Sequence, residues 1–246
     1  MVSKVAFITG GNRGLGLQTA LELKDVARVV IGARDLARGE KALEKLRAAG
    51  ADADMLQFDV TQPASHRAAY DYFNTRYGRL DILVNNAGMA GGTFPSAGPE
   101  HSAAEVPMDL LRKVFEPNFF SQVALTQVLL PLIKKSKAGR IVNLSSILAS
   151  LTLEATPGSP IYDAKSFAYG ASKTALNAFT IHLAYDLRGT KIKVNSAHPG
   201  WVKTRMGGPN ATMELSEGAK TSAALATLPD DGPTGGFFHL GQPLPW

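Results

Sequence analysis

The stretch IYDAKSFAYGASK, residues 161–173, holds two tyrosine–lysine pairs whose side chains could carry out proton transfer. Tyr169 and Lys173 are four residues apart, so on a helix both side chains lie on one face. A nearby ammonium favours phenolate and lowers the pKa of a tyrosine, which can then exchange a proton with an alcohol oxygen near neutral pH. Tyr162 and Lys165 lie in a proline-containing segment without helical period. Geometry therefore favours Tyr169 and Lys173, although spacing alone would favour an ordinary helix with no catalytic role.

The elements that must position these residues follow from the pattern of the whole chain. Short runs rich in Val, Ile and Leu stop at Gly, Asn or Ser, which is typical of buried parallel strands. They cover residues 4–10, 27–33, 79–88, 139–146 and 191–200, with a weaker run at 53–60. Helical periods cover residues 15–25, 36–50, 63–78, 107–135 and 168–187. This alternation predicts one Rossmann-type α/β domain over residues 1–246, a doubly wound and mostly parallel sheet flanked by helices on both faces.

Three segments are predicted to be substrate-site loops or a lid: 89–106, 147–168 and 201–220. The first is rich in Gly, Pro and Ala, and the second has two prolines and no clear period. Both follow predicted strands, and ligands of such folds bind at the carboxyl ends of the strands. We therefore expect these segments to line the mouth of a site.

Composition excludes several other classes of protein. The chain has 246 residues, 45% of them hydrophobic and 19% charged, as in ordinary soluble domains. It has no cysteine, which excludes disulfides, thiolate metal sites and a cysteine nucleophile, and we expect no metal. It has no long apolar run and no signal peptide, so we expect a cytoplasmic protein without a membrane partner. The net charge of +5 is scattered, and Lys134, Lys135 and Lys137 have no interleaved aromatic residues, which argues against nucleic-acid binding.

The segment TGGNRGLG, residues 9–16, lies between the first predicted strand and the first predicted helix. Gly10, Gly14 and Gly16 would let the backbone turn tightly and approach a pyrophosphate. The helix that follows would direct its free N–H groups at that phosphate. The position of this loop at the first strand of an alternating chain predicts a dinucleotide site.

The end of the second predicted strand indicates which dinucleotide binds. NAD would require an acidic residue there to accept hydrogen bonds from the ribose, but the chain reads Ala33-Arg34. Arg34, together with Arg13 of the glycine loop, could clamp a 2′-phosphate. Asp35 follows directly, at a position where a helix cap is expected. The sequence therefore favours NADP(H) over NAD(H).

Six segments resemble the short-chain dehydrogenase/reductase family: TGGNRGLG, NNAG (85–88), Asn118, NLSS (143–146), YGASK and HPGWVKT (198–204). They stand in the family's order and the resemblance covers nearly the whole chain. The final third looks like the carbonyl-reductase and sniffer-like branch, which reduces aldehydes and ketones with NADPH.

The resemblance implies a role for each catalytic residue. Tyr169 would be the general acid in reduction, and Lys173 would bind the nicotinamide ribose and lower the pKa of Tyr169. Ser146 would hold the carbonyl oxygen; Ser145 suits this role less well, because strand alternation directs it to the opposite face. Asn118 would hold a water that links Lys173 to solvent.

The resemblance also implies the cofactor contacts. Asp59 would contact the adenine, residues 86–88 would pack along the cofactor, and residues 199–204 would meet the nicotinamide carboxamide. The predicted contacts are Gly10, Asn12, Arg13, Gly14, Leu15, Gly16, Arg34, Asp59, Val60, Asn86, Ala87, Gly88, Tyr169, Lys173, Pro199, Gly200, Val202 and Thr204.

The chain departs from the family pattern in several places. Ser146 and Tyr169 are 23 residues apart, wider than is usual, as in the carbonyl-reductase-like branch. The extra residues lie near a helix through which many relatives dimerise, so we expect a monomer or homodimer rather than a tetramer. Pro117 should kink its helix and aim Asn118. Arg205 stands where relatives often carry an aspartate, and no physical reason for it is evident.

The substrate pocket is predicted to be apolar. Its candidate walls are Leu148, Tyr162, Trp201 and Met206. His198 could be read as a catalytic base, but packing is the preferred interpretation because Tyr169 fills that role. The sequence thus favours NADPH-dependent reduction of small hydrophobic aldehydes or ketones. The alternatives are an NAD-dependent alcohol or steroid dehydrogenase and a dinucleotide-binding sensor without turnover.

Overall fold

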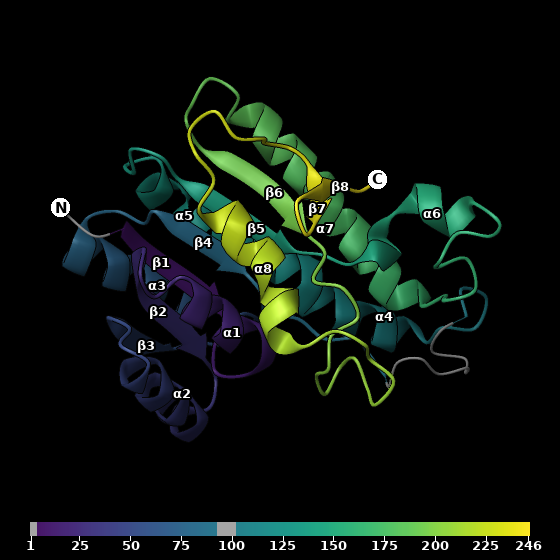
Figure 1. Cartoon of the computed structure of the whole chain (residues 1–246), viewed down its shortest axis with the longest axis horizontal. Helices are drawn as coiled ribbons and strands as arrows, with labels where there is room; N and C mark the ends of the chain where they lie inside the picture. Colours follow the sequence, from purple (N-terminus) through teal and green to yellow (C-terminus); the bar gives the residue numbers. More distant parts are fainter. Residues whose placement is uncertain (1–3, 93–101) are drawn as a thin grey trace.

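The computed structural model describes residues 4–92 and 102–246. Its centre is a sheet in which the strands follow the order β3-β2-β1-β4-β5-β6-β7-β8 (Figure 1). All neighbouring strands are parallel except β7 and β8. The order reverses between β1 and β4, where such sheets open a ligand crevice. The strands are β1 (Lys4–Thr9), β2 (Ala27–Ala33), β3 (Ala53–Gln57), β4 (Ile82–Asn85), β5 (Arg140–Leu144), β6 (Lys193–Ala197), β7 (Phe237–His239) and β8 (Gln242–Pro243).

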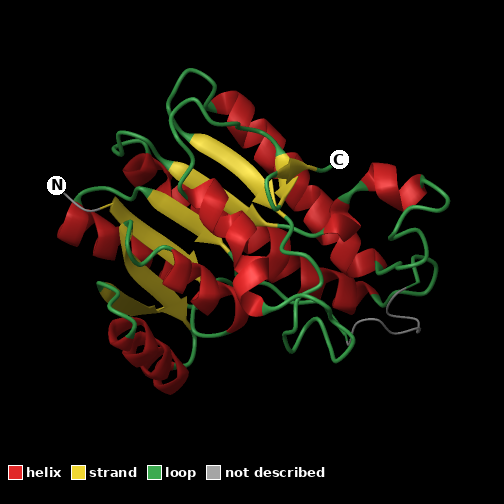
Figure 2. Cartoon of the chain, in the orientation of Figure 1, coloured by secondary structure: helices red, strands yellow, loops and turns green. Residues whose placement is uncertain are grey.

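Helices cover both faces of this sheet (Figure 2). Each face has its own hydrophobic core. Alternate residues of β1 divide between the cores: Val5 and Phe7 pack on one face, and Ala6 and Ile8 on the other. One face is covered by α3 (Pro63–Tyr77), α5 (Ser121–Ile133) and α7 (Phe167–Asp186). The opposite face is covered by α1 (Gly14–Glu22), α2 (Leu36–Ala48) and α8 (Leu215–Ala226). The predicted fold class is confirmed.

The predicted helix at 107–135 is divided into three parts. A π-helical turn, η2 (Glu116–Phe120), separates α4 (Met108–Phe115) from α5. Pro117 is the second residue of this turn, and a proline has no N–H to donate to the preceding turn. The N–H of Ser121 instead bonds to the carbonyl of Glu116, five residues back. The irregularity expected at Pro117 is therefore present, and it contains Asn118.

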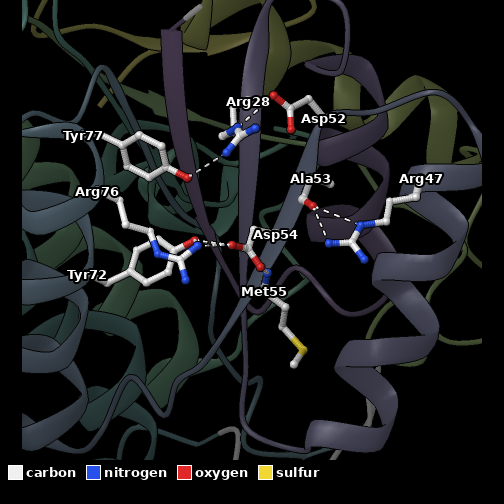
Figure 3. Close-up of polar contacts among 9 residues, drawn as sticks. All are labelled: Arg28, Arg47, Asp52, Ala53, Asp54, Met55, Tyr72, Arg76 and Tyr77. Atoms are coloured by element: carbon white, nitrogen blue, oxygen red, sulfur yellow. Dashed lines mark hydrogen bonds and ion pairs between the residues drawn. The ribbon is translucent and has the colours of Figure 1, made fainter.

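The edge strand β3 is fastened to helices on both faces of the sheet, as Figure 3 shows. From α3, the Tyr72 hydroxyl and the Arg76 guanidinium donate to the Asp54 carboxylate at 2.5 and 2.9 Å. From α2, the Arg47 guanidinium donates to the carbonyl of Ala53 at 3.2 Å. These contacts fix an edge that would otherwise be free to pair with another strand.

The expected loop segments contain structure that the sequence pattern did not indicate. Residues 147–168 form two short helices, η3 (Ile147–Ala149) and α6 (Leu151–Ala155), before α7 begins. Residues 201–220 run into α8, and residues 93–101 of the first segment lie outside the described residues. Strands β7 and β8 are too short for a period to show. Among the described residues, no helix is long and apolar enough to cross a membrane.

Candidate active site

Tyr169 and Lys173 lie in the first two turns of α7, one helical turn apart. Ser146, which follows β5, lines the same cavity as Tyr169 and acts to lower the pKa of its phenol. The Lys173 ammonium donates to the carbonyl of Leu144 at 2.7 Å and lies 5.9 Å from the centroid of the Tyr169 ring. Ser145 is buried, and its hydroxyl has no partner within the described part of the chain. The fold thus joins the serine and the tyrosine–lysine pair that the sequence favoured.

The second tyrosine–lysine pair lies outside this group. The Lys165 ammonium is bound by Glu154 of α6, at 2.6 Å to its carboxylate and 2.5 Å to its carbonyl. It also lies 4.9 Å from the centroid of the exposed Tyr162 ring. This pair therefore fastens α6 to the segment that leads into α7.

Burial sets the proton affinities of the two α7 residues. Crowding by protein atoms raises the pKa of Tyr169 to about 12, although the hydrogen bond from Ser146 acts in the opposite direction. Burial lowers the pKa of Lys173 to about 7. The sequence predicted a lowered pKa for Tyr169, but in the protein without its cofactor this pKa is raised. The reason is that desolvation disfavours phenolate and ammonium alike, so Lys173 carries less positive charge to stabilise the phenolate.

Asn118 is buried beside Lys173, and its amide is fully engaged with protein groups. Its oxygen accepts from the N–H of Met89, and its nitrogen donates to the carbonyl of Met89, both at 2.8 Å. The nitrogen also donates to the Ser172 hydroxyl at 3.0 Å. A Cβ on Gly88 would stand 2.8 Å from the Asn118 oxygen and 3.6 Å from the Lys173 ammonium. The Asn118 side chain therefore fixes the backbone that borders Lys173.

A cavity of about 470 Å³ opens above these residues. Ser146, Tyr169 and Lys173 line it, together with Leu15 of the glycine loop. The other predicted cofactor contacts along it are Asn86, Gly88, Pro199, Gly200, Val202 and Thr204. Reacting groups and predicted cofactor residues thus share one space, at the carboxyl ends of β4, β5 and β6.

The glycine loop is built for close approach of another molecule. Gly10 and Gly14 have φ values of 64° and 53°, which side chains rarely adopt. A Cβ on Gly16 would lie 2.5 Å from the Asn86 amide nitrogen and 2.6 Å from the Gly10 carbonyl oxygen. The Asn86 amide also donates to the carbonyl of Thr9 at 2.7 Å. This cradle, open to the cavity at Leu15, fits a dinucleotide.

A second cavity, of about 180 Å³, lies between α1 and α2 and is basic. Asn12 and Arg13 line it as predicted, and Arg38, Lys41 and Lys45 add three cations. Asp35 caps α2, since its carboxylate accepts from the N–H of Arg38 at 2.9 Å and lies 3.6 Å from its guanidinium. The expected helix cap is confirmed, and the Asp35 carboxylate is engaged with Arg38. The cavity fits an anion such as a 2′-phosphate.

The family follows from comparison of the whole chain. Residues 4–215 match the short chain dehydrogenase family model. The chain belongs to the short chain dehydrogenase family. Carbonyl reductase [NADPH] 1 of Mus musculus is 36% identical, with 98% of each chain aligned. The NADPH-bound carbonyl reductase from chicken fatty liver has a TM-score of 0.84 at 26% identity and 100% coverage of both chains. Carbonyl reductase Sniffer of D. melanogaster has a TM-score of 0.82 at 28% identity, covering 99% of this chain and 100% of its own.

Some predicted residues of this short-chain dehydrogenase lie outside both cavities. Arg34 is exposed and absent from the lining of the basic cavity. The Asp59 carboxylate is engaged in its own turn, accepting from the N–H and hydroxyl of Thr61 at 3.0 and 2.9 Å. Val60 is buried, and its carbonyl contacts the His66 ring at 2.6 Å. The N–H of Ala87 donates to the Thr9 hydroxyl at 2.9 Å, which fixes that segment against β1.

On the substrate side, three of the four predicted wall residues line the large cavity: Leu148, Trp201 and Met206. Tyr162 does not, and its buried neighbour Ile161 does. Sequence reasoning missed seven apolar lining residues: Leu144 at the end of β5 and, in the less regular segments, Met89, Ala90, Ile147, Pro160, Ile161 and Ala164. Only their apolar character marked those in the less regular segments, because irregular segments have no period that assigns a side chain to a face. For Arg38, Lys41 and Lys45 a signal existed, since spacings of three and four residues place them on one face of α2.

Proposed function

We propose that this enzyme reduces small apolar aldehydes and ketones to alcohols, with Tyr169 as the proton donor. The observation that carries the proposal is that Ser146, Tyr169 and Lys173 line one cavity, which also reaches the glycine loop at Leu15. NADP(H) is the cofactor, and when bound it supplies the hydride. The same residues can serve the reverse reaction.

Each residue has a task that its surroundings support. Ser146 donates a hydrogen bond to the carbonyl oxygen, which polarises the carbonyl and holds it beside Tyr169. Tyr169 stays protonated at neutral pH, because its pKa is about 12, and gives its proton to the oxygen as negative charge develops there. The Lys173 ammonium is held by the Leu144 carbonyl, 5.9 Å from the centroid of the Tyr169 ring. There it is placed to stabilise the phenolate that forms.

Cofactor and substrate class rest on the two cavities. The basic cavity and the engaged Asp35 favour a 2′-phosphate, in agreement with the names of the carbonyl reductase relatives. The substrate wall is apolar, with contributions from Leu148, Ile161 and Trp201, and among the described residues it offers no carboxylate or arginine to a charged substrate. This favours neutral, hydrophobic carbonyl compounds. A cytoplasmic location, a single domain and a monomeric or dimeric state stay predictions.

The test is consumption of NADPH and NADH, in parallel, with a panel of aromatic and aliphatic aldehydes and ketones. Tyr169→Phe should lower turnover by about 10²–10⁴-fold, the usual contribution of a general acid. Tyr162→Phe is the matched control and should turn over normally, because that ring lies outside the cavity.

Full activity of Tyr169→Phe would refute the proton-donor role. A clear preference for NADH would instead favour the NAD-dependent dehydrogenase. Tight NADPH binding without turnover of any carbonyl would favour the sensor.

A further inference from the structure

His198 lies between the end of β6 and the cavity, and its ring joins two loops. The Nδ1 atom accepts from the N–H of Ile147 at 3.2 Å and from the N–H of Gly200 at 3.4 Å. Ile147 directly follows Ser146, and Gly200 belongs to the Pro199–Gly200 turn at the predicted nicotinamide site. One nitrogen atom thus contacts both the segment that binds the carbonyl and the segment that borders the cofactor.

The histidine itself is held by neighbouring strands. The backbone N–H of His198 donates to the carbonyl of Phe238 at 2.8 Å, which extends the pairing of β6 with β7. Its carbonyl contacts the Nδ1 atom of His239 at 2.9 Å, and the two rings lie 4.8 Å apart between centroids. The residue is 8% exposed. The ring therefore has little freedom to follow a movement of either loop.

Two donors converge on one nitrogen, so this nitrogen must be unprotonated and the imidazole proton must stand on Nε2. Burial, helped by the neighbouring His239, lowers the pKa of His198 to about 3. A group with this proton affinity is a poor general base near neutral pH. This agrees with the interpretation of His198 as a packing residue and not a catalytic base. Its packing nevertheless joins two segments of the site.

We propose that His198 is a positioning residue that couples the Ser146 loop to the Pro199–Gly200 turn through its Nδ1 acceptor. The proposal rests on the function proposed above. By joining these two segments, His198 would fix the distance between the Ser146 hydroxyl, which binds the carbonyl, and the cofactor beside the Pro199–Gly200 turn. Without the acceptor, two N–H groups lose their partner and each loop can shift. A shift of about 1 Å in such a site can lower turnover about 100-fold.

The substitutions that test this differ in where they place an acceptor. His198→Asn puts an amide oxygen near the position of Nδ1 and should keep kcat/KM of the same order as the wild type. His198→Gln puts its oxygen near Nε2, and His198→Leu has none. Both should lower kcat/KM by about 100-fold, as expected for a displacement of about 1 Å. His182→Leu, on the exposed side of α7, is the control and should be without effect.

Two measurements separate coupling from general loss of structure. If His198 acts through Ser146, the double variant Ser146→Ala/His198→Leu should be little slower than Ser146→Ala alone, because effects within one network are not additive. Amide hydrogen exchange of Ile147 and Gly200, followed by NMR without substrate, should accelerate in His198→Leu and His198→Gln but not in His198→Asn.

Equal behaviour of the Asn, Gln and Leu variants, or full additivity with Ser146→Ala, would overturn the proposal. If the wild type reduces no carbonyl compound, the proposed function fails, and the exchange rates alone decide the role of His198. Unchanged exchange in the Leu variant would then refute the coupling.

Discussion

The Asn118 side-chain amide makes two hydrogen bonds to the backbone of Met89. Its oxygen accepts from the Met89 N–H and its nitrogen donates to the Met89 carbonyl, each at 2.8 Å. This pair joins the π-helical turn to the segment that leaves β4, directly beside Lys173. The amide can make both bonds only if its plane is turned toward Met89. The irregular turn that contains Pro117 is what presents Asn118 in this way.

Replacement of Pro117 with Ala should therefore slow catalysis more than it changes stability. Alanine has an N–H and favours the α-helix, so the turn can return to ordinary helical pairing and rotate Asn118 away from Met89. We expect kcat for carbonyl reduction to fall while the affinity for NADPH changes little. Pro131→Ala, at the proline inside α5, is the control for the loss of a helical proline. Unchanged turnover of Pro117→Ala would refute the idea that the kink aims Asn118.

Gly16→Ala should abolish tight NADPH binding. Alanine suits a helix better than glycine, so local propensity alone would predict stabilisation by about 1 kcal/mol. The new Cβ would however stand 2.5 Å from the Asn86 amide nitrogen and displace the phosphate cradle. Overpacking of this kind costs about 1–3 kcal/mol, which urea denaturation would detect. Gly189→Ala, which meets nothing within 4 Å, should leave both stability and the dissociation constant of NADPH unchanged.

Arg38→Ala should move cofactor preference toward NADH. A hydrogen bond to a charged group contributes about 1.5–3 kcal/mol, which is about 10–100-fold in affinity. The loss should appear in KM for NADPH and not in KM for NADH, because NADH has no 2′-phosphate. Arg188→Ala, at the far end of α7, should leave the ratio of the two cofactors unchanged. An equal loss for both cofactors would place Arg38 outside the phosphate site.

Lys173→Met should flatten the rise of stability with pH. The unfolded chain keeps a proton on Lys173 up to its ordinary pKa of 10.5, whereas burial makes the folded protein release it near pH 7. Between pH 7 and 10.5 the unfolded state binds more protons than the folded state, so the free energy of unfolding of the wild type increases with pH. Below pH 7 the folded protein must bury the Lys173 charge, which lowers its stability. Urea denaturation of the cofactor-free protein across this range measures the slope. Lys165→Met, outside the cavity, is the control, and equal slopes in wild type and Lys173→Met would contradict the lowered pKa.

Particular residues show where sequence reasoning reached its limit. Asp35 is the cap that its position indicated. Arg34, which the end of β2 pointed to, is exposed and lines neither cavity. Tyr162 and Ile161 are neighbours in an irregular segment, and only the packing of that segment against α7 decides that Ile161 lines the cavity. Strands β7 and β8 have three and two residues, too few for an alternation to be recognised.

The sequence by itself determined the alternating strands and helices, because each element has its own period. It predicted the dinucleotide loop from its place after the first strand, and it favoured Tyr169 with Lys173 because a spacing of four residues puts both on one helix face. The tertiary structure decided that Ser146 meets Tyr169, that the pKa of Tyr169 rises, and that His198 joins two loops. The physical reason is that burial and hydrogen bonding between β5, β6 and α7 depend on residues far apart in the chain. No local pattern encodes which atoms those elements bring into contact.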